Sequence, residues 1–568
     1  MEGSMMIHDR AIAYFSMEIA LHNGIPTYSG GLGILAGDML KSAADLNVPM
    51  VAVTLLHEKG YFHQKLDEQG NQSEESVDWD PRNFLEPLPA TVKVEIEDRS
   101  VKIRGWKYEI QGNRGFTIPV YFLDTNLEAN DPQDRSLTGH LYGGDARYRL
   151  CQEVILGRGG IRLLRELGYD SIKKYHINEG HASLLLLDLL DETRQKLQKR
   201  ETDPETIEAV KRRSVFTTHT PVAAGHDRFP ADLTRQVLGE REFSHLSGFH
   251  GNDGLDMTRL ALHLSGYVNA VARKHGEVAR AMFPGHSIQS ITNGVHSVTW
   301  TSEPFRKLFD QYLPGWRQDS FALRHALDIP KEAVWAAHLE AKQTLLDLVN
   351  QGEKTGMDVP VFTIGFARRA AVYKRADLLF HDINRLKKIA TEAGPIQIIF
   401  AGKAHPQDRE AKAVITKIFQ SQRDLKSHIK VVYLTNYDME MGKKITSGVD
   451  LWLNTPISPL EASGTSGMKA CHNGIPQLSV LDGWWVEGHM EGVTGWAIAQ
   501  DGKASDGDDR ERDAAYLYHK LENVIVPMFY RKREKYLNVM KHCIALNASF
   551  FNTQRMVQEY VTNAYLSL

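Results

Sequence analysis

The segment EASGTSGMKACHNG, from Glu461 to Gly474, constrains the fold and function of this chain more than any other stretch. It lies between two short apolar runs, at 450–453 and 477–481, which are typical of buried strands. Gly464 and Gly467 would let a ligand approach the backbone closely, and the neighbouring hydroxyl groups are hydrogen-bonding partners. Lys469, just downstream of this loop, is interpretable as a phosphate-binding charge, a Schiff-base nucleophile or a solvated surface residue. A P-loop is excluded, because the spacing G-x-x-x-x-G-K-[ST] is not met.

Short β-rich runs alternate with longer amphipathic segments on both sides of the chain's middle. We expect strands at 12–15, 51–55, 117–123, 176–177 and 215–218, and again at 361–366, 396–401, 429–434, 450–453 and 477–481. Helical patterns separate them, for example at 36–46 and 183–200. Such alternation predicts an α/β protein with two doubly wound parallel sheets. Because ligands bind outside the carboxyl ends of such strands, two facing sheets would form a cleft.

Three further features refine this organisation. Alternating residues at 92–98 and 101–110 predict a peripheral antiparallel hairpin. An Asn-Gly turn followed by Pro304 places a boundary between the two halves near 293–304. The tail from about 510 is helical in pattern, with a second helix capped near Asn552 or Thr553.

Composition excludes several classes of protein. The 568 residues are 42% hydrophobic and 24% charged, which is typical of soluble globular proteins of two or three domains. A formal net charge of −4 gives no general attraction to nucleic acid or anionic membranes. Three widely spaced cysteines favour a reducing compartment over a disulfide framework. We see no secretory signal and no apolar run of membrane-spanning length, so we expect a cytoplasmic protein.

Two motifs favour the binding of anions. The stretch YSGGLG at 28–33 would place backbone N–H groups at the start of a helix, although the acidic residue expected of a dinucleotide site is missing. The stretch from Arg368 to Arg375 contains four cations directly after a predicted strand. A solvated helix face is the alternative interpretation, but a position at the mouth of the cleft favours phosphate binding.

Polar residues also follow predicted strands, at 178–181, 218–221 and 292–294. Asn, His and Glu at strand ends suit hydrogen bonds to sugar hydroxyls, while each alone is also common in turns and caps. Neither His176 nor His181 belongs to a metal-binding pattern, and we expect no metal.

Together these motifs resemble the α-glucan (glycogen, starch or maltodextrin) phosphorylases, and more closely their short bacterial-type branch. The resemblance covers most of the chain and rests on the order of YSGGLG (28–33), THTPV (218–222), ITNGV (291–295), RAAVYKR (369–375) and EASGTSGMK (461–469). GYFHQ (60–64) and FNTQRMVQEY (551–560) are similar to the bacterial branch. The most specific element is EASGT…MK, whose lysine binds pyridoxal phosphate in that family.

The resemblance implies a GT-B fold, with two Rossmann-like domains facing across a cleft. It implies an N-terminal domain at 1–294, a domain that binds pyridoxal 5'-phosphate at 295–530, and C-terminal helices at 531–568 that pack back on the first domain. The implied reaction is reversible phosphorolysis of α-1,4-glucans by inorganic phosphate, releasing α-glucose 1-phosphate with retention of configuration. The cofactor's phosphate would be the proton partner of the substrate phosphate. A homodimer is the assembly that the family suggests.

The resemblance also implies roles for individual residues. The catalytic group would comprise Lys374, Arg369, His219 and Glu461. The cofactor would be bound by Lys469, Gly464, Thr465, Arg368, Tyr437 and Gly31. Glucose would contact Asn293, Ser463, Tyr373 and His181.

Departures from the family pattern leave alternatives open. Arg368 stands where lysine is usual, Asp438 replaces an arginine beside the cofactor, and Ser466-Gly467 replaces the common Gly-Asn. The first motif starts close to the N-terminus, so we expect no extended N-terminal regulatory region. One alternative is a nucleotide-sugar-dependent glucan synthase of GT-B fold, which would need no lysine at position 469. Another is a glucan-binding homologue without catalysis, and an NAD oxidoreductase is the most distant.

Overall fold

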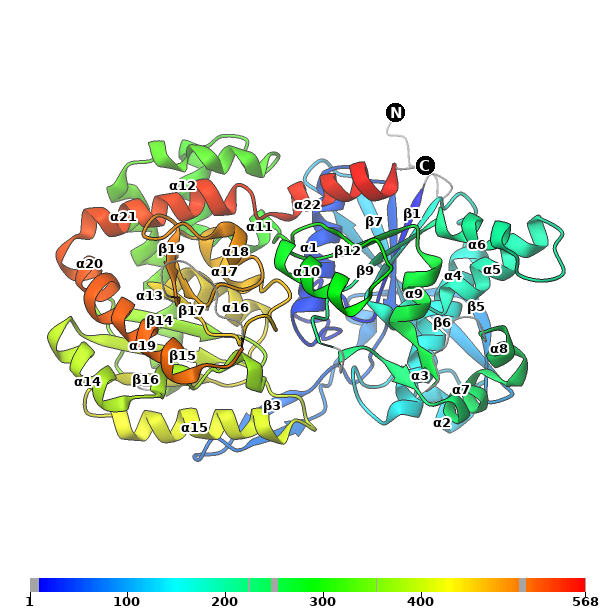
Figure 1. The fold of residues 1–568 in the computed structure, drawn as a ribbon, viewed down its shortest axis with the longest axis horizontal. Helices are drawn as coiled ribbons and strands as arrows, with labels where there is room; N and C mark the ends of the chain where they lie inside the picture. Colours follow the sequence, from blue (N-terminus) through cyan, green and yellow to red (C-terminus); the bar gives the residue numbers. More distant parts are fainter. Residues whose placement is uncertain (1–9, 223–224, 247–253, 354, 500–506, 567–568) are drawn as a thin grey trace.

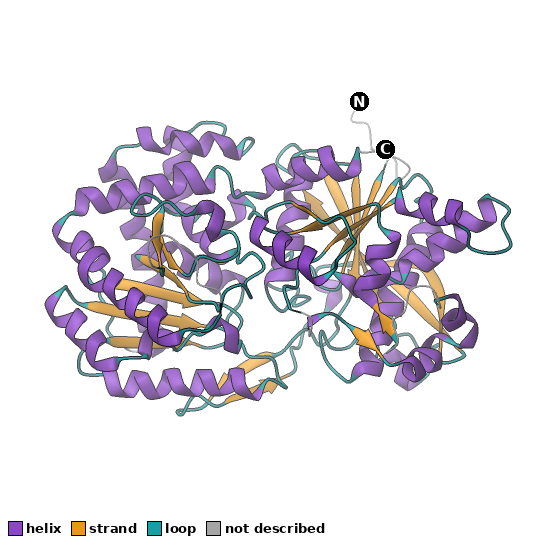
Figure 2. Ribbon diagram, viewed as in Figure 1, coloured by secondary structure: helices purple, strands orange, loops and turns teal. Residues whose placement is uncertain are grey.

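The computed structural model describes residues 10–222, 225–246, 254–353, 355–499 and 507–566. Within these ranges the chain forms two large sheets, each flanked by helices (Figures 1 and 2). This confirms the predicted α/β class with parallel sheets. No helix in the described part of the chain has both the length and the apolar character needed to cross a membrane.

The first sheet has nine strands in the order β13-β12-β9-β8-β1-β2-β7-β6-β5. Strands from β13 to β7 pair in parallel, while β6 pairs antiparallel with both β7 and β5, so the predicted hairpin forms one edge of this sheet. The strands are β1 (Ile12–Ser16), β2 (Met50–Leu55), β5 (Glu86–Ile96), β6 (Arg99–Gln111), β7 (Thr117–Asp124), β8 (Lys174–Asn178), β9 (Ser214–Thr217), β12 (Tyr267–Ala270) and β13 (Gln289–Ser290).

The second sheet has six strands in the order β16-β15-β14-β17-β18-β19, and all neighbours are parallel. The strands are β14 (Phe362–Ala367), β15 (Ile396–Ala401), β16 (Lys430–Leu434), β17 (Leu451–Asn454), β18 (Gln477–Ser479) and β19 (Gly495–Ala497). The sequence predicted five of these and missed the three-residue strand β19.

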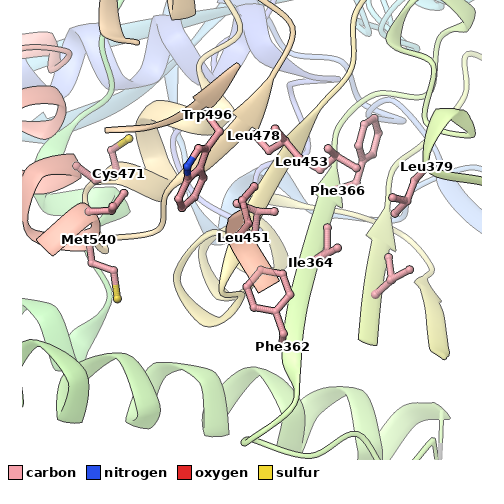
Figure 3. Packing of buried hydrophobic residues seen from close by; sticks show 14 of the residues in the cluster. Phe362, Ile364, Phe366, Leu379, Leu451, Leu453, Cys471, Leu478, Trp496 and Met540 are labelled. Carbon is pink, nitrogen blue, oxygen red and sulfur yellow. The ribbon is translucent and has the colours of Figure 1, made fainter. Parts of the chain in front are cut away.

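The central parallel strands of both sheets are buried on both faces, as is usual for parallel sheets between helices. In β1, Ala13 and Phe15 pack into one hydrophobic cluster, while Ile12 and Tyr14 pack into another on the opposite face. In the second sheet, side chains from β14 and β17 gather on one face with Trp496 (Figure 3).

Helices cover the first sheet and its edges. They are α1 (Gly31–Asp45), α2 (Pro132–Arg135), α3 (Ala146–Val154), α4 (Gly160–Glu166), α5 (Leu185–Lys196), α6 (Pro204–Lys211), α7 (Ala231–Leu238), α8 (Glu240–His245), α9 (Met257–Leu264) and α10 (Arg273–Met282).

The remaining helices belong to the second half of the chain. They are α11 (Ser297–Trp300), α12 (Glu303–Tyr312), α13 (Lys331–Glu353), α14 (Ile383–Glu392), α15 (Arg409–Leu425), α16 (Met439–Gly448), α17 (Ser466–Cys471), α18 (Trp485–Gly488), α19 (Arg510–Lys520), α20 (Val526–Arg531), α21 (Arg533–His542) and α22 (Thr553–Tyr560).

The last helix, α22, packs beside α1 of the first half of the chain (Figure 1). Its N-cap is Asn552, whose side chain accepts a hydrogen bond from the backbone N–H of Arg555, which confirms the predicted cap. Just beyond the helix, the hydroxyl of Tyr565 lies 2.7 Å from Nδ1 of His176 in β8. The end of the chain is therefore attached to the first sheet.

Two small antiparallel sheets complete the fold, one formed by β10 (Arg228–Phe229) with β11 (Leu255–Asp256) and one by the hairpin of β3 (His63–Leu66) with β4 (Gln72–Glu75). The β3–β4 hairpin, although early in the sequence, binds the second half of the chain. Gln64 donates to the carbonyl of Gly402 and Gln72 to that of Ala404, each at 2.9 Å. The hairpin therefore connects the two halves near the ends of the second sheet's strands.

Candidate active site

A cavity of about 470 Å³ lies where the carboxyl ends of the second sheet's strands meet the loops of the first half. Residues from both halves of the chain line it. Every site residue that the sequence nominated is among them: Gly31, His181, His219, Asn293, Arg368, Arg369, Tyr373, Lys374, Tyr437, Glu461, Ser463, Gly464, Thr465 and Lys469.

Strand order explains why residues so far apart in sequence meet here. In the second sheet, β16, β15, β14 and β17 are neighbours, and Tyr437, Lys403, Arg368 and Glu461 follow their carboxyl ends. In the first sheet, β8 and β9 are neighbours, and His181 and His219 follow them. Ligands of doubly wound sheets usually bind just outside the carboxyl ends of the strands, which is where this cavity lies.

Glu461 is the centre of the charged network in the cavity. Its carboxylate accepts hydrogen bonds from Lys374 Nζ at 2.6 and 2.8 Å and from Arg368 Nη2 at 2.7 Å. Burial acts to raise the pKa of this carboxyl, but the two cations outweigh burial and lower the pKa to about 2. Glu461 is therefore ionised at neutral pH. Behind it, Asp482 accepts the backbone N–H of Glu461 at 2.8 Å.

The fourth cation of the 368–375 run does not belong to the cavity. Arg375, in a left-handed conformation, is only 1% exposed. It donates to the carbonyls of Thr455 and Pro456 and pairs with Asp513 at 2.6 Å. Its role is to fix the loop that carries Lys374 to the segment after β17.

Lys469 lies in the last turn of the short helix α17 and is buried. Its Nζ lies 3.7 Å from the ring centre of Trp300, whose indole N–H donates to Asp38 at 2.6 Å. Burial lowers the pKa of Lys469 to about 8. At pH 8 about half of such amines are neutral, against well under 1% of an ordinary lysine, so Lys469 is suited to react with a carbonyl.

The first half contributes neutral histidines. His219 Nε2 lies 2.6 Å from Oδ1 of Asn178, and the backbone N–H of His219 donates to Glu179 at 2.7 Å. Burial lowers the pKa of both His219 and His181 to about 3. Both rings are uncharged at neutral pH and are suited to hydrogen bonding rather than to ion pairing.

The glycine-rich loop at 28–33 differs from its predicted form. Helix α1 begins at Gly31, not at Ala36, and the N–H groups of Ser29 and Gly30 are already bound by the buried carboxylate of Glu18, at 2.5 and 3.3 Å. These two donors are therefore not open to an external anion. Gly31 remains, because a Cβ built there meets nothing within 4 Å and would point into open space.

Asp438 has local partners that explain the acid at this position. Its Oδ1 accepts the backbone N–H of Met441 at 2.8 Å and caps α16, and Oδ2 accepts from Asn23 at 3.3 Å. It still lines the cavity, next to Tyr437.

Sequence reasoning missed several cavity residues, notably Glu18, Tyr142, Arg149, Trp300 and Lys403. A signal existed for Lys403, because it follows a predicted strand just as Arg368 does. No local pattern marks the others, which reach the cavity through tertiary packing.

The only group of possible metal ligands found among the described residues is Glu153, His181 and Asp227, whose ligand atoms lie within 4.8 Å of one another. The guanidinium of Arg149 already lies among them, 3.1 Å from Glu153 and 2.9 Å from Asp227. Because an arginine supplies the positive charge there, this cluster reads as a buried ion-pair network.

The cavity has more positive than negative side chains available to a ligand. Arg149, Arg368 and Lys374 are ion-paired as described. Among the described residues, no carboxylate oxygen lies within the 4.0 Å ion-pair limit of Arg369, Lys403 or Lys469, which also line the cavity. Cations left without carboxylates in a partly buried cavity favour the binding of an anion such as phosphate.

Comparison with known proteins agrees with this chemistry. The family model described as "Phosphorylase: Carbohydrate phosphorylase" matches residues 222–495. A maltodextrin phosphorylase of Thermococcus litoralis is 39% identical over 98% of this chain and 70% of the relative. The chain belongs to the carbohydrate phosphorylase family. A glycogen phosphorylase of Aquifex aeolicus is 34% identical over 98% of this chain and 86% of its own length.

Membership of the carbohydrate phosphorylase family confirms the resemblance that the motifs carried. A further relative, an uncharacterised protein of Methanocaldococcus jannaschii, is 32% identical over 97% of this chain and 99% of its own length. For a carbohydrate phosphorylase, a cavity that combines unpaired cations with neutral hydrogen-bonding side chains is the expected kind of site.

Proposed function

We propose that this protein catalyses the reversible phosphorolysis of α-1,4-glucans by inorganic phosphate, giving α-glucose 1-phosphate with retention of configuration. The observation that carries the proposal is the charge pattern of the cavity, where Arg369, Lys403 and Lys469 have no carboxylate partner among the described residues. A site that must hold phosphate groups against a glucosyl cation-like transition state needs such fixed positive charge.

Pyridoxal 5'-phosphate fits the residues present, and we propose it as the cofactor. Lys469 supplies a buried amine with a lowered pKa. A Cβ built at Gly31 meets nothing within 4 Å, so the backbone there is accessible, and the side-chain oxygen of Ser463 is buried without a hydrogen-bond partner. When bound, the cofactor would supply a phosphate that exchanges a proton with the substrate phosphate. Lys469, Gly464, Thr465, Arg368, Tyr437 and Gly31 would hold it.

The remaining side chains act on the substrates. Arg369 and Lys374 would bind inorganic phosphate, and the release of Lys374 from Glu461 would free a cation for that purpose. Neutral His219, together with Asn293, whose Oδ1 is buried without a partner, would bond glucose hydroxyls. Ser463, Tyr373 and His181 would complete the sugar site, and the ionised Glu461 would counter positive charge at the anomeric carbon.

We further propose the GT-B arrangement, with domains at 1–294 and 295–530 and C-terminal helices at 531–568 returning to the first domain. Two observations support it. The sheets separate along the chain near Asn293, and Tyr565 reaches His176 in the first sheet.

The test is to incubate purified protein with phosphate and maltodextrin, with and without pyridoxal phosphate, and to assay glucose 1-phosphate. We expect product only with the cofactor, and none from Lys469→Met. Maltodextrin binding without product would favour a non-catalytic homologue. Glucan extension from a nucleotide sugar, independent of Lys469, would favour the synthase.

A further inference from the structure

Lys403 is a cavity cation for which no sequence motif predicts a role. It lies two residues beyond β15, and its backbone carbonyl accepts the N–H of Ala370 at 2.9 Å. Strands β14 and β15 are in register from Phe362 and Ile396 to Ala367 and Ala401, so Lys403 leaves the sheet at the same edge as Arg368. Tyr437 and Asp438 follow the next strand, β16.

The β3–β4 hairpin and the residues just before it hold Lys403 in place. Its Nζ donates to the carbonyl of Phe62 at 2.9 Å and lies 5.3 Å from the centre of that ring. Gln64 and Gln72 fix the backbone on either side, at Gly402 and Ala404. The otherwise unexplained GYFHQ motif at 60–64 thus positions one ammonium group at the cavity.

One carbonyl bond leaves most of that ammonium's hydrogen-bonding capacity unused, since it carries three donors. Burial lowers the pKa of Lys403 to about 8, which makes its position costly unless an anion compensates it. The acid whose charge acts on Lys403 is Asp438, but the carboxylate of Asp438 already accepts hydrogen bonds from the backbone N–H of Met441 and from the side chain of Asn23. No carboxylate oxygen in the described part of the chain lies within 4.0 Å of Lys403.

We propose that Lys403 binds the phosphate group of the pyridoxal phosphate cofactor, beside Arg368 and Tyr437. This inference rests on the proposed function. With Arg368, Lys403 would be the second cation on the cofactor phosphate, beside the carboxylate of Asp438 that follows β16. The substrate phosphate is assigned to Arg369 and Lys374, which follow β14, whereas Lys403 follows β15.

The experiment compares two ligands that differ only in the phosphate, pyridoxal 5'-phosphate and pyridoxal. Cofactor-free wild type, Lys403→Met and Lys403→Arg are titrated with each, following bound-cofactor absorbance, and attachment at residue 469 is verified by reduction and mass spectrometry. A charged hydrogen bond is worth roughly 10- to 100-fold in affinity. We expect Lys403→Met to lose about that factor for pyridoxal phosphate and none for pyridoxal, with Lys403→Arg recovering most of the loss.

Lys412→Met is the matched control, because Lys412 also joins the second half to the hairpin, through Glu74 at 2.6 Å, but does not line the cavity. It should bind both ligands like the wild type. Equal losses for both ligands in Lys403→Met, or no loss for either, would overturn the inference. An unchanged cofactor affinity with weaker inorganic phosphate binding by the loaded enzyme would also overturn it, by assigning Lys403 to the substrate. A wild type that attaches neither ligand would instead refute the proposed function.

Discussion

Replacing Lys469 with methionine should stabilise the cofactor-free protein. Methionine is similar in volume to lysine and is readily buried, whereas burial lowers the pKa of Lys469 from 10.5 to about 8. Each pKa unit is worth about 1.4 kcal/mol, so the buried amine costs the fold about 3 kcal/mol at neutral pH. The stacking on Trp300 and the attraction of Asp38 only partly offset burial.

The sign of the pH dependence follows from the depressed pKa. Between pH 8 and 10.5 the unfolded chain binds a proton at residue 469 and the folded chain does not, so wild-type stability falls as the pH falls across this window. Below pH 8 the cost is complete and constant. The difference between Lys469→Met and wild type should therefore be about 3 kcal/mol at pH 7 and should shrink towards pH 10.5.

The assay is thermal unfolding of the cofactor-free proteins at pH 7, 8, 9 and 10. Lys342→Met is the contrasting variant, because Lys342 is also buried but is ion-paired with Asp450 at 2.5 Å. Removing Lys342 takes a partner from a buried carboxylate and should destabilise by about 3–5 kcal/mol. A Lys469→Met protein that is less stable than wild type at pH 7, or whose advantage does not change with pH, would refute the reasoning.

Three other substitutions test the site. Lys374→Ala should lower kcat/KM by about 10²–10³-fold with little change in unfolding temperature, because Arg368 still compensates Glu461; a full-rate variant would contradict the assignment. Burial raises the pKa of Asp482 to about 7, so the folded chain keeps a proton that the unfolded chain loses near pH 3.8, and the contribution of Asp482 to stability should fall from about pH 4 to pH 7. Asp482→Asn should remove that part of the pH dependence, and an offset that is constant with pH would argue against it. Gly464→Ala should cost about 1–3 kcal/mol, because Gly464 has φ +77° and its Cβ would lie 3.1 Å from Glu461, and it should also weaken cofactor binding. Gly492→Ala carries similar strain at φ +70° with nothing within 4 Å, so it should lose stability without affecting the cofactor.

Much of the fold was predictable because parallel strands buried on both faces are continuous apolar runs. The runs at β14, β15 and β16 needed no tertiary information, and neither did the Asn552 cap. The strands β12, β13 and β19 escaped prediction: β13 consists of two polar residues, and Asn269 interrupts the apolar run of β12. The β3–β4 hairpin is polar and partly exposed, and its partners lie more than 300 residues away.

The candidate site was also only partly predictable from the sequence. By itself the sequence determined the family and nominated the residues around Glu461, Arg369 and Lys469, because those side chains stand in ordered, specific motifs beside predicted strand ends. Only the tertiary structure decided which charges compensate one another. In the structure Lys374 pairs with Glu461, whereas Arg375 pairs with Asp513 outside the cavity. The backbone N–H of Ser29 donates to the carboxylate of Glu18, and Lys403 lines the cavity. The physical reason is that burial and ion pairing depend on distances between segments hundreds of residues apart, which local pattern does not encode.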